Sequence, residues 1–485
     1  MRECGILLPV FSLRGSYGIG TLGHEAKEWI DFLAKSGVHH WQILPIGPTG
    51  FSNSPYQPFS SFAGNPLLIS PDLLAEDGLL TRAECTCWHL DKGKVDYDRV
   101  YRFADEALRT AFSRFTESED YRAFCAAQAW LDDYALFMAA KEANGQAAWY
   151  EWEAGLRLHQ REALERCRGE WARKIRFHKF VQYEFYRQWQ ALHDYAKKRK
   201  VSLIGDMPIY VALDSADAWA EPEQFQLDEN HKPVAVAGCP PDYFSEDGQL
   251  WGNPLYDWEA MRRDGYRWWR ARFRHAAALF DGIRIDHFRG FASYWSVPAG
   301  AKTAKSGMWI PGPGMDLFRH AAGEIGDCKI IAEDLGIITD EVRDLLKQSG
   351  FPGMSVLQFA FVKGKISEYL PFRQRENSVC YTGTHDNDSL LGWLSTLDDE
   401  TKKYVYRYTH TSSDPDCADA LIDMAWSSPA ALCVVPLQDL LHLGSEARIN
   451  TPSVCQGNWE WRMPRGALTE ALSESIAERN ETYFR

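Results

Sequence analysis

The chain has 485 residues, of which 45% are hydrophobic and 13% aromatic, so it can bury a large core as one barrel or as two to four ordinary domains. Its net charge of −14 repels phosphates and anionic lipids, so neither nucleic acid nor a membrane is expected as a partner. We expect no secretory leader and no membrane span, and the 11 scattered cysteines favour reduced thiols in a cytoplasmic protein.

Short aliphatic or β-branched runs between turn residues predict eight strands. In chain order they cover residues 5–10, 41–46, 202–211, 282–286, 329–334, 354–361, 378–386 and 431–437. Most runs are continuous rather than alternating, which is typical of parallel strands covered on both faces. Amphipathic helices are predicted after the first and fifth runs, at residues 24–37 and 340–350. This alternation predicts an α/β fold, a (β/α)₈ (TIM) barrel whose C-terminal strand ends carry the chemistry.

Two connections are too long for plain barrel loops. Residues 47–201 are largely helical by pattern, and a late helix repeats apolar side chains at about 3.6-residue spacing over 177–192. We therefore predict one catalytic barrel over residues 1–485, with an inserted helical subdomain at approximately 72–175. Residues 210–258 are polar and rich in Pro and Gly, which is typical of a long loop that serves as a substrate lid.

Charged residues end several of the predicted strands. In DGIRIDHFRG, Arg284 and Asp286 share one strand face because side chains alternate, and both point toward the barrel mouth. The fifth and seventh strands end with further titratable residues: Glu333, Asp334, His385, Asp386 and Asp388. Glycoside chemistry needs two carboxylates across one bond, one ionised and one protonated, and a third suits the positive transition state. The pattern therefore predicts a site for this chemistry.

Each part of this site has a simpler interpretation. Asp286 would otherwise be half of a structural ion pair, and Asp334 is assigned to capping the helix that follows it. The segment 384–388, THDND, would alternatively form an Asx-turn or a metal site. The metal is disfavoured because barrel metal sites need several histidines at strand ends, whereas His39 and His40 lie at a strand start on opposite faces.

The segment GIGTLG, residues 18–23, matches a dinucleotide-binding pattern. The preceding strand ends about eight residues earlier, and the second strand leads into LPIGPTG with no acidic residue to hold a ribose. Dinucleotide binding is therefore disfavoured.

The chain resembles the 4-α-glucanotransferases, also called amylomaltases or disproportionating enzymes, of glycoside hydrolase family 77 in the α-amylase clan. The segments that carry the resemblance are DGIRIDHFRGF, IIAEDLG, YTGTHDND, YGIGTLG, WQILPIGPTG, SPYQPFSSFAGNPLLIS, IGDMPIYVALDSADAWA, GCPPDYFSEDGQLWGNPLYDW, WIPGPG and RINTP. They follow the family's order over the whole chain apart from the helical insertion. A lone GxRxD is weakly specific, whereas SPYQ and the PPDYF to GNPLY segment make the resemblance strong.

The resemblance implies a role for each catalytic residue. Asp286 would be the nucleophile, kept ionised by Arg284, and Glu333 would be the general acid and base. Asp386 and His385 would hydrogen-bond the hydroxyls of the ring under attack. A retaining mechanism also implies that the carboxyl groups of Asp286 and Glu333 lie about 5 to 5.5 Å apart.

The resemblance also implies a set of sugar contacts. Tyr56 would stack beneath the reacting ring, and Asp206 would support the site from the third strand. The residues implied on the acceptor side are Tyr243, Phe244, Gln249, Trp251, His287 and Phe359. The expected partners are maltooligosaccharides and other α-1,4-glucans, with no metal and no organic cofactor.

The implied activity is transfer of an α-1,4-glucan segment to the 4-OH of glucose or of another glucan. Hydrolysis by an α-amylase-type enzyme is an alternative, because water or a sugar can intercept the same intermediate, and a non-catalytic glucan-binding barrel is another. Three segments depart from the family pattern: LLPVFSL at residues 7–13, FAFVKGK at 359–365 and YLPFRQREN at 369–377. The last two segments lie on the loop between the sixth and seventh strands, so these departures bear on the preferred donor length or the acceptor contacts more than on the catalytic chemistry.

Overall fold

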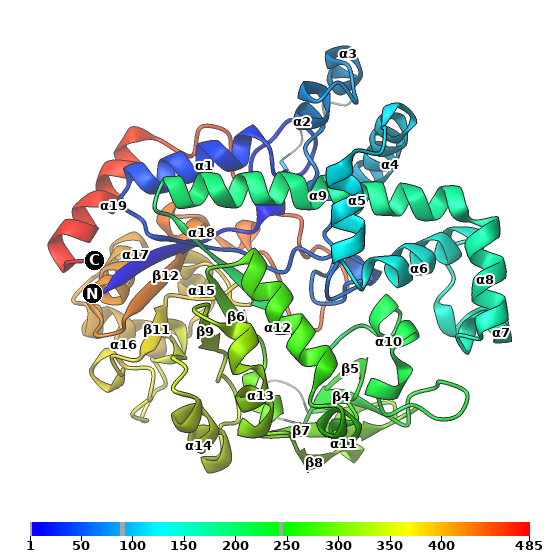
Figure 1. Ribbon diagram of the computed structural model, residues 1–485. Helices are drawn as coiled ribbons and strands as arrows, with labels where there is room; N and C mark the ends of the chain where they lie inside the picture. The colour runs from blue at the N-terminus through cyan, green and yellow to red at the C-terminus, as the bar shows by residue number, and fades with distance from the viewer. Residues whose placement is uncertain (1, 88–92, 242–245) are drawn as a thin grey trace.

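A closed barrel of eight parallel strands forms the centre of the protein (Figure 1), in a computed structural model that describes residues 2–87, 93–241 and 246–485. Each strand pairs with the barrel strands before and after it in the chain, and β1 closes the ring on β12. The barrel strands are β1 (Glu3–Leu7), β2 (His40–Gln42), β3 (Ser202–Met207), β6 (Gly282–Ile285), β9 (Lys329–Ala332), β10 (Gly353–Val356), β11 (Ser378–Tyr381) and β12 (Leu432–Pro436). The predicted (β/α)₈ barrel is confirmed.

All eight predicted runs overlap a barrel strand, but every strand ends earlier than its run. The run predicted at 41–46 is a strand only over His40–Gln42, and the one at 378–386 only over Ser378–Tyr381. An apolar pattern reports burial, and the buried chain continues past the last ladder hydrogen bond into the loops at the barrel mouth. As a result Asp286, Glu333 and Asp386 lie just beyond their strands.

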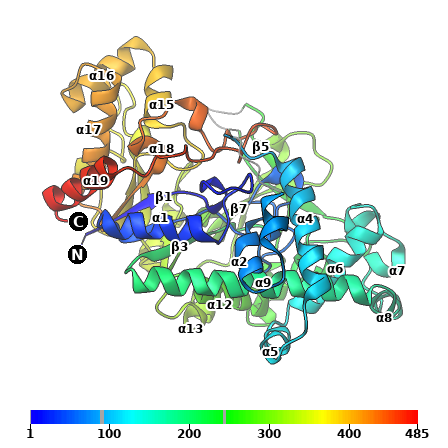
Figure 2. The ribbon, with the colours of Figure 1, turned by 90° about the horizontal axis from the view of Figure 1, so that it is seen from above.

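Helices surround the barrel (Figure 2), and the two chain termini lie side by side. The N-terminal strand and the C-terminus are joined by Arg485, whose Nη1 donates to the Glu3 carbonyl at 2.9 Å. The helices that follow barrel strands are α1 (His24–Lys35), α12 (Arg267–Leu279), α13 (Met315–Ile325), α14 (Asp340–Ser349), α15 (Leu390–Thr396), α16 (Asp399–Thr409), α17 (Asp414–Ser427), α18 (Leu437–Leu440) and α19 (Glu470–Tyr483). Both predicted amphipathic helices are present, as α1 and α14.

The connection between β2 and β3 is helical, as its pattern predicts. It contains α2 (Pro71–Glu76), α3 (Arg82–Thr86), α4 (Tyr97–Arg114), α5 (Glu119–Ala127), α6 (Leu131–Ala143), α7 (Ala154–Arg157), α8 (Arg161–Glu170) and α9 (Ala172–Lys198). The long helix α9 buries the expected apolar stripe and packs against both α6 and the barrel helix α1 (Figure 1). Because α9 is shared by the insertion and the barrel wall, a separate subdomain at 72–175 stays a prediction.

The region 210–258 contains more regular structure than its polar composition indicates. It forms α10 (Ala216–Ala220), β4 (Ala235–Cys239) and β5 (Gln249–Pro254), and it leads into α11 (Trp258–Arg263). Strands β4 and β5 join β7 (Ser293–Pro298) and β8 (Met308–Pro311) in a four-stranded antiparallel sheet of order β5-β4-β7-β8. This sheet was missed because its two halves come from separate barrel connections, and the role of the region as a lid stays a prediction.

An ion pair between a buried lysine and a partly buried aspartate ties the helical insertion to the loop after β3. Lys141 on α6 is 1% exposed, and its Nζ lies 2.6 Å from a carboxylate oxygen of Asp214. The other oxygen of Asp214 accepts from the Trp149 amide at 3.2 Å. Removing one member of a buried pair leaves its partner uncompensated.

Replacing Lys141 with methionine is therefore expected to lower the free energy of unfolding by about 2–3 kcal/mol, measured by urea denaturation. The matched control is Arg161→Met, which breaks an ion pair with Glu165 whose side chains are 85% and 58% exposed. The control is expected to change stability by less than about 0.5 kcal/mol. Equal losses of unfolding free energy in the two variants would show that the Lys141–Asp214 pair stabilises the protein no more than an exposed pair does.

No helix in residues 2–87, 93–241 and 246–485 combines the length and the apolar character that crossing a membrane requires.

Candidate active site

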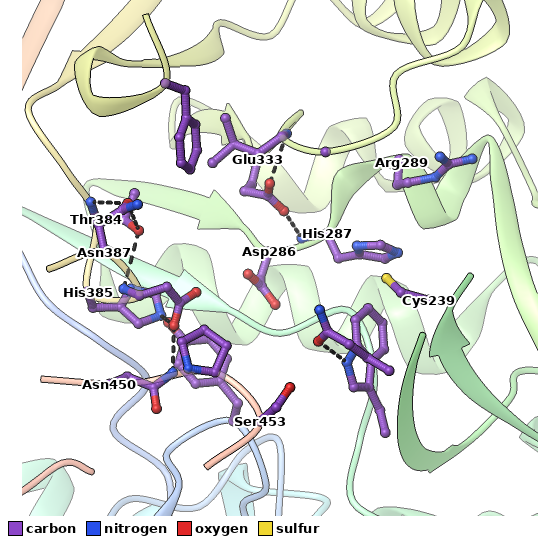
Figure 3. Close-up of a pocket in the computed structure, with 18 of the residues that line it drawn as sticks. Cys239, Asp286, His287, Arg289, Glu333, Thr384, His385, Asn387, Asn450 and Ser453 are labelled. Carbon is purple, nitrogen blue, oxygen red and sulfur yellow. Dashed lines mark hydrogen bonds and ion pairs between the residues drawn. The ribbon is translucent and has the colours of Figure 1, made fainter. Parts of the chain in front are cut away.

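The strand ends of the barrel open into a cavity of about 1610 Å³, and the three predicted carboxylates all line it. Asp286 follows β6, Glu333 follows β9, and Asp386 lies in the loop after β11. Figure 3 shows Asp286 and Glu333 at the centre of this cavity, with His385 on one side and His287 on the other. The structure therefore brings together side chains that the sequence places up to about a hundred residues apart.

Asp286 lies next to a buried guanidinium. Arg284 Nη2 is 3.0 Å from Asp286 Oδ1, while Arg284 Nη1 donates to both oxygens of Asp206 at 2.8 and 2.7 Å. Arg284 and Asp206 are directly opposite each other in the β3–β6 ladder, so their side chains reach the same height on the same face. Tyr56 Oη also donates to Asp206, at 2.9 Å. Arg284 is thus an ion-pair partner of Asp286, as the simpler interpretation holds, and of Asp206 as well.

Glu333 is held by the backbone on both sides. Its Oε2 accepts from the His287 amide at 2.7 Å and its Oε1 from the Leu335 amide at 2.8 Å. His287 adopts the left-handed conformation with φ 51°, which directs the chain away from β6 immediately after Asp286. These two bonds fix the carboxyl group of Glu333 in the cavity beside Asp286.

Burial raises the pKa of Glu333 and Asp386 adds to this shift, whereas the guanidinium of Arg284 and the amides of Leu335 and His287 oppose it. Burial also raises the pKa of Asp286; the guanidinium of Arg284 opposes the shift, and the neighbouring carboxylates reinforce it. Two carboxyl groups in one apolar-walled cavity cannot both be ionised without cost. The site therefore favours one retained proton.

Asp386 is positioned by residues from the next barrel connection. Its Oδ1 accepts from Asn450 Nδ2 at 2.6 Å and lies 3.3 Å from His385 Nε2. Arg448 Nη2 donates to the Asp386 carbonyl at 2.7 Å. Sequence reasoning gave no role to Asn450 or Arg448, although both belong to the RINTP segment that contributed to the family resemblance.

Aromatic rings form the wall beside His385. The Tyr56 ring is stacked on the His385 ring, with centroids 5.1 Å apart and an interplanar angle of 13°. Trp459, which also lines the cavity, lies 5.8 Å from the Tyr56 ring. Trp459 was missed because no motif surrounds it and most tryptophans of this chain are buried in its core.

The opposite wall carries three of the residues predicted on the acceptor side, Gln249, Trp251 and His287. The Trp251 ring meets the His287 ring edge-on at 4.9 Å, and Trp251 Nε1 donates to Gln249 Oε1 at 3.1 Å. Phe359, which lies after β10, lines the same cavity and is 37% exposed. The predicted residues Tyr243 and Phe244 lie outside the described residues.

Two acidic residues near the site have other partners. The predicted helix-capping role of Asp334 is wrong, because α14 begins at Asp340, further along the chain, and its preceding cap residue is Thr339. Asp334 Oδ1 instead accepts from the Met354 amide at 2.7 Å, which ties the loop after β9 to β10. Asp388 accepts from Ser445 Oγ at 2.6 Å and from the Ser389 amide at 2.8 Å, so its carboxylate braces the loop.

The alternative ligand sites find no support in the described part of the chain. Within it, no three His, Cys, Asp or Glu side chains are grouped to hold a metal ion. The GIGTLG segment ends at α1, where the Glu25 carboxylate accepts from Thr21 N at 3.0 Å and from Thr21 Oγ1 at 2.6 Å. A carboxylate of the protein itself thus occupies two donors of this segment.

A parallel barrel with carboxylates and aromatic rings gathered at its C-terminal strand ends is the architecture of enzymes that act on glycosidic bonds. Glycoside hydrolase family 77, described as 4-alpha-glucanotransferase, matches residues 8–469 of this sequence. The chain belongs to this family.

Individual relatives match along their whole length. The 4-alpha-glucanotransferase of Streptococcus pneumoniae is 45% identical over 492 aligned positions, which cover 100% of this chain and 97% of the relative. That of Thermus thermophilus is 45% identical, with 99% of each chain covered. A solved structure of amylomaltase from Streptococcus agalactiae in complex with acarbose superposes with a TM-score of 0.97 at 37% identity, covering 100% of both chains.

Proposed function

We propose that this protein is a 4-alpha-glucanotransferase that moves an α-1,4-glucan segment from a donor maltooligosaccharide to the 4-OH of glucose or of another glucan. One observation carries the proposal: Asp286, paired with Arg284, and Glu333, held by two backbone amides, line one cavity at the barrel mouth. Membership in family 77 supports it.

The reaction is a retaining double displacement. Asp286 attacks C1 of the donor sugar while Glu333 gives its proton to the departing glucosidic oxygen, which forms a β-glucosyl ester and frees the shortened glucan. In the second step, Glu333 takes the proton from the 4-OH of the acceptor, whose oxygen attacks C1 and releases Asp286. The bond broken and the bond formed are both α-1,4, so no energy source and no cofactor is required.

The surroundings of the two carboxyl groups support this division of labour. Asp286 contacts a guanidinium, which favours the ionised form that a nucleophile needs. No cation forms an ion pair with Glu333 in the described part of the chain, and burial raises its pKa, which favours the protonated form. Since burial raises the pKa of both carboxyl groups, we assign the single proton of the pair to Glu333 because Arg284 forms its ion pair with Asp286.

The remaining residues bind the sugar on either side of the scissile bond. Asp386 and His385 are placed to accept and donate hydrogen bonds to hydroxyls of the reacting ring, and Tyr56 closes that side with its ring. Asp206 acts through Arg284. On the acceptor side, His287, Gln249, Trp251 and Phe359 offer polar atoms and apolar surface to the incoming glucan.

Transfer differs from hydrolysis only in what intercepts the ester. A bound acceptor has a large effective-concentration advantage over water, up to about 10⁵ M or more in favourable intramolecular cases. Incubation with maltotriose separates the alternatives. We expect glucose together with a ladder of longer oligosaccharides and a constant number of reducing ends, measured by chromatography and a reducing-end assay. Reducing ends that rise in step with consumption would instead identify a hydrolase, and unchanged maltotriose would identify a binding protein.

We further propose a cytoplasmic location. No disulfide joins cysteines within the described residues, which suits a reducing compartment. The substrates expected there are maltooligosaccharides and other α-1,4-glucans, and these are neutral, in keeping with a protein of net charge −14 that attracts no polyanion.

A further inference from the structure

Trp309 on β8 is an exposed aromatic residue at the cavity wall, outside the machinery described above. Its side chain lines the cavity and it is 37% exposed, whereas every other tryptophan in the described part of the chain is less exposed. A flat aromatic ring exposed in a cavity of this kind offers apolar surface on which a sugar ring can stack.

The ring of Trp309 has two close neighbours. The guanidinium carbon of Arg289 lies 3.7 Å from the ring centroid, and Arg289 is only 3% exposed. Arg289 Nη2 donates to Ser293 Oγ at 3.1 Å, and its Nη1 donates to the Ile337 carbonyl. Trp295, directly opposite Trp309 in the β7–β8 ladder, meets its ring edge-on at 5.1 Å. These two neighbours contact the ring before any ligand arrives.

The same contacts place Trp309 on the acceptor side. Figure 3 shows Arg289 beyond His287 as seen from Asp286, on the side away from His385 and Asn450. His385 belongs to the group proposed to hold the reacting ring, so the leaving and incoming glucans lie toward His287. Ile337, which Arg289 holds, follows Glu333 by four residues in the same loop. Arg289 therefore links the loop of the general acid to the tryptophan.

We propose that Trp309 is a stacking platform for an acceptor glucose unit beyond the one that reacts, and that Arg289 is the residue that positions its ring. The apolar C–H face of a glucose unit fits a flat indole, and the guanidinium of Arg289 covers one face of the ring and leaves the other for the sugar. The inference rests on the proposed function and adds a selectivity to it: acceptors of several glucose units bind more tightly than glucose itself.

The test is the acceptor KM of Trp309→Ala, with α-maltosyl fluoride as donor and release of fluoride as the signal. We expect the KM for maltotriose as acceptor to rise about tenfold, because a stacking contact of this kind is lost. The KM for glucose and both kcat values are expected to stay within about twofold, since glucose reaches only the reacting position. Trp309→Phe, which keeps a flat ring, is expected to retain most of the maltotriose affinity.

The matched control is Met308→Ala. Met308 is the neighbour of Trp309 on β8 and is 59% exposed, but it is not among the residues that line the cavity. It is expected to leave both KM values unchanged. Arg289→Lys is expected to raise the maltotriose KM selectively but by less than Trp309→Ala, because a cation still approaches the ring.

The outcomes are distinguishable. If Trp309→Ala changes neither KM, or raises the two in proportion, Trp309 is no acceptor platform. If Trp309→Ala does not fold, Trp309→Leu answers the same question, since it keeps apolar volume without a flat ring. If the unaltered protein releases fluoride but passes the maltosyl unit only to water, the proposed function fails rather than this inference.

Discussion

Replacing Asp286 with asparagine is expected to lower kcat for transfer among maltooligosaccharides by about 10⁴-fold or more, because a carboxamide cannot form the glycosyl ester. Initial rates of oligosaccharide formation from maltotriose measure the loss. The variant is expected to fold, since asparagine has the same shape and removes a carboxylate whose pKa is raised by burial. Thermal unfolding of the variant checks this.

The control for this variant is Asp388→Asn. Asp388 lies on the loop that carries Asp386 and lines the same cavity, but its carboxylate is held by Ser445 and Ser389. Its loss is expected to reduce kcat by less than about tenfold, as expected of loop bracing rather than chemistry. Full turnover by Asp286→Asn would show that Asp286 is not the nucleophile of a double displacement. Equal losses in both variants would show that the loops, and not the nucleophile, limit the rate.

Replacing Glu333 with glutamine is expected to lower kcat with maltotriose by about 10²–10⁴-fold, because the departing oxygen then receives no proton. With α-maltosyl fluoride the first step is expected to recover, since fluoride departs without a proton. The second step still lacks its base, so the glycosyl ester on Asp286 is expected to accumulate and to be detectable by mass spectrometry of the digested protein. Asp286→Asn is expected to gain nothing from the fluoride donor. If the fluoride donor restored the first step in Asp286→Asn, or failed to restore it in Glu333→Gln, the assigned roles of nucleophile and general acid would be wrong.

The pH profile provides a second readout for Glu333. Its pKa is raised by burial, and the protonated form is the active one, so kcat/KM with maltotriose is expected to fall as pH rises through that pKa. At low pH the rate falls for the opposite reason, because the pair gains a second proton and Asp286 is neutralised. With α-maltosyl fluoride and Glu333→Gln the alkaline decline is expected to disappear. An alkaline decline that persists would assign the acid to another group.

Hydrophobic patterning anticipated the barrel but not the extent of its strands. Each apolar run overlaps a strand, since a strand that is buried on both faces needs such a run, yet the run continues into buried loops without ladder partners. The antiparallel sheet of β4, β5, β7 and β8 was not anticipated, because the pairing of its strands joins two separate barrel connections.

The order of residues along the chain was enough to place Arg284 and Asp286 on one strand face and to bring Asp286, Glu333 and Asp386 to one rim. Strand periodicity and barrel closure bring the ends of β6, β9 and β11 to one rim, and these three residues follow those ends. The partners that tune these groups could not be derived in this way. The contacts of Asn450 with Asp386, of Tyr56 with Asp206 and of Arg289 with Trp309 depend on the course of loops that start at different strands. Packing between segments that are distant in the sequence determines the path of these loops. The local pattern of apolar and polar residues does not encode that packing.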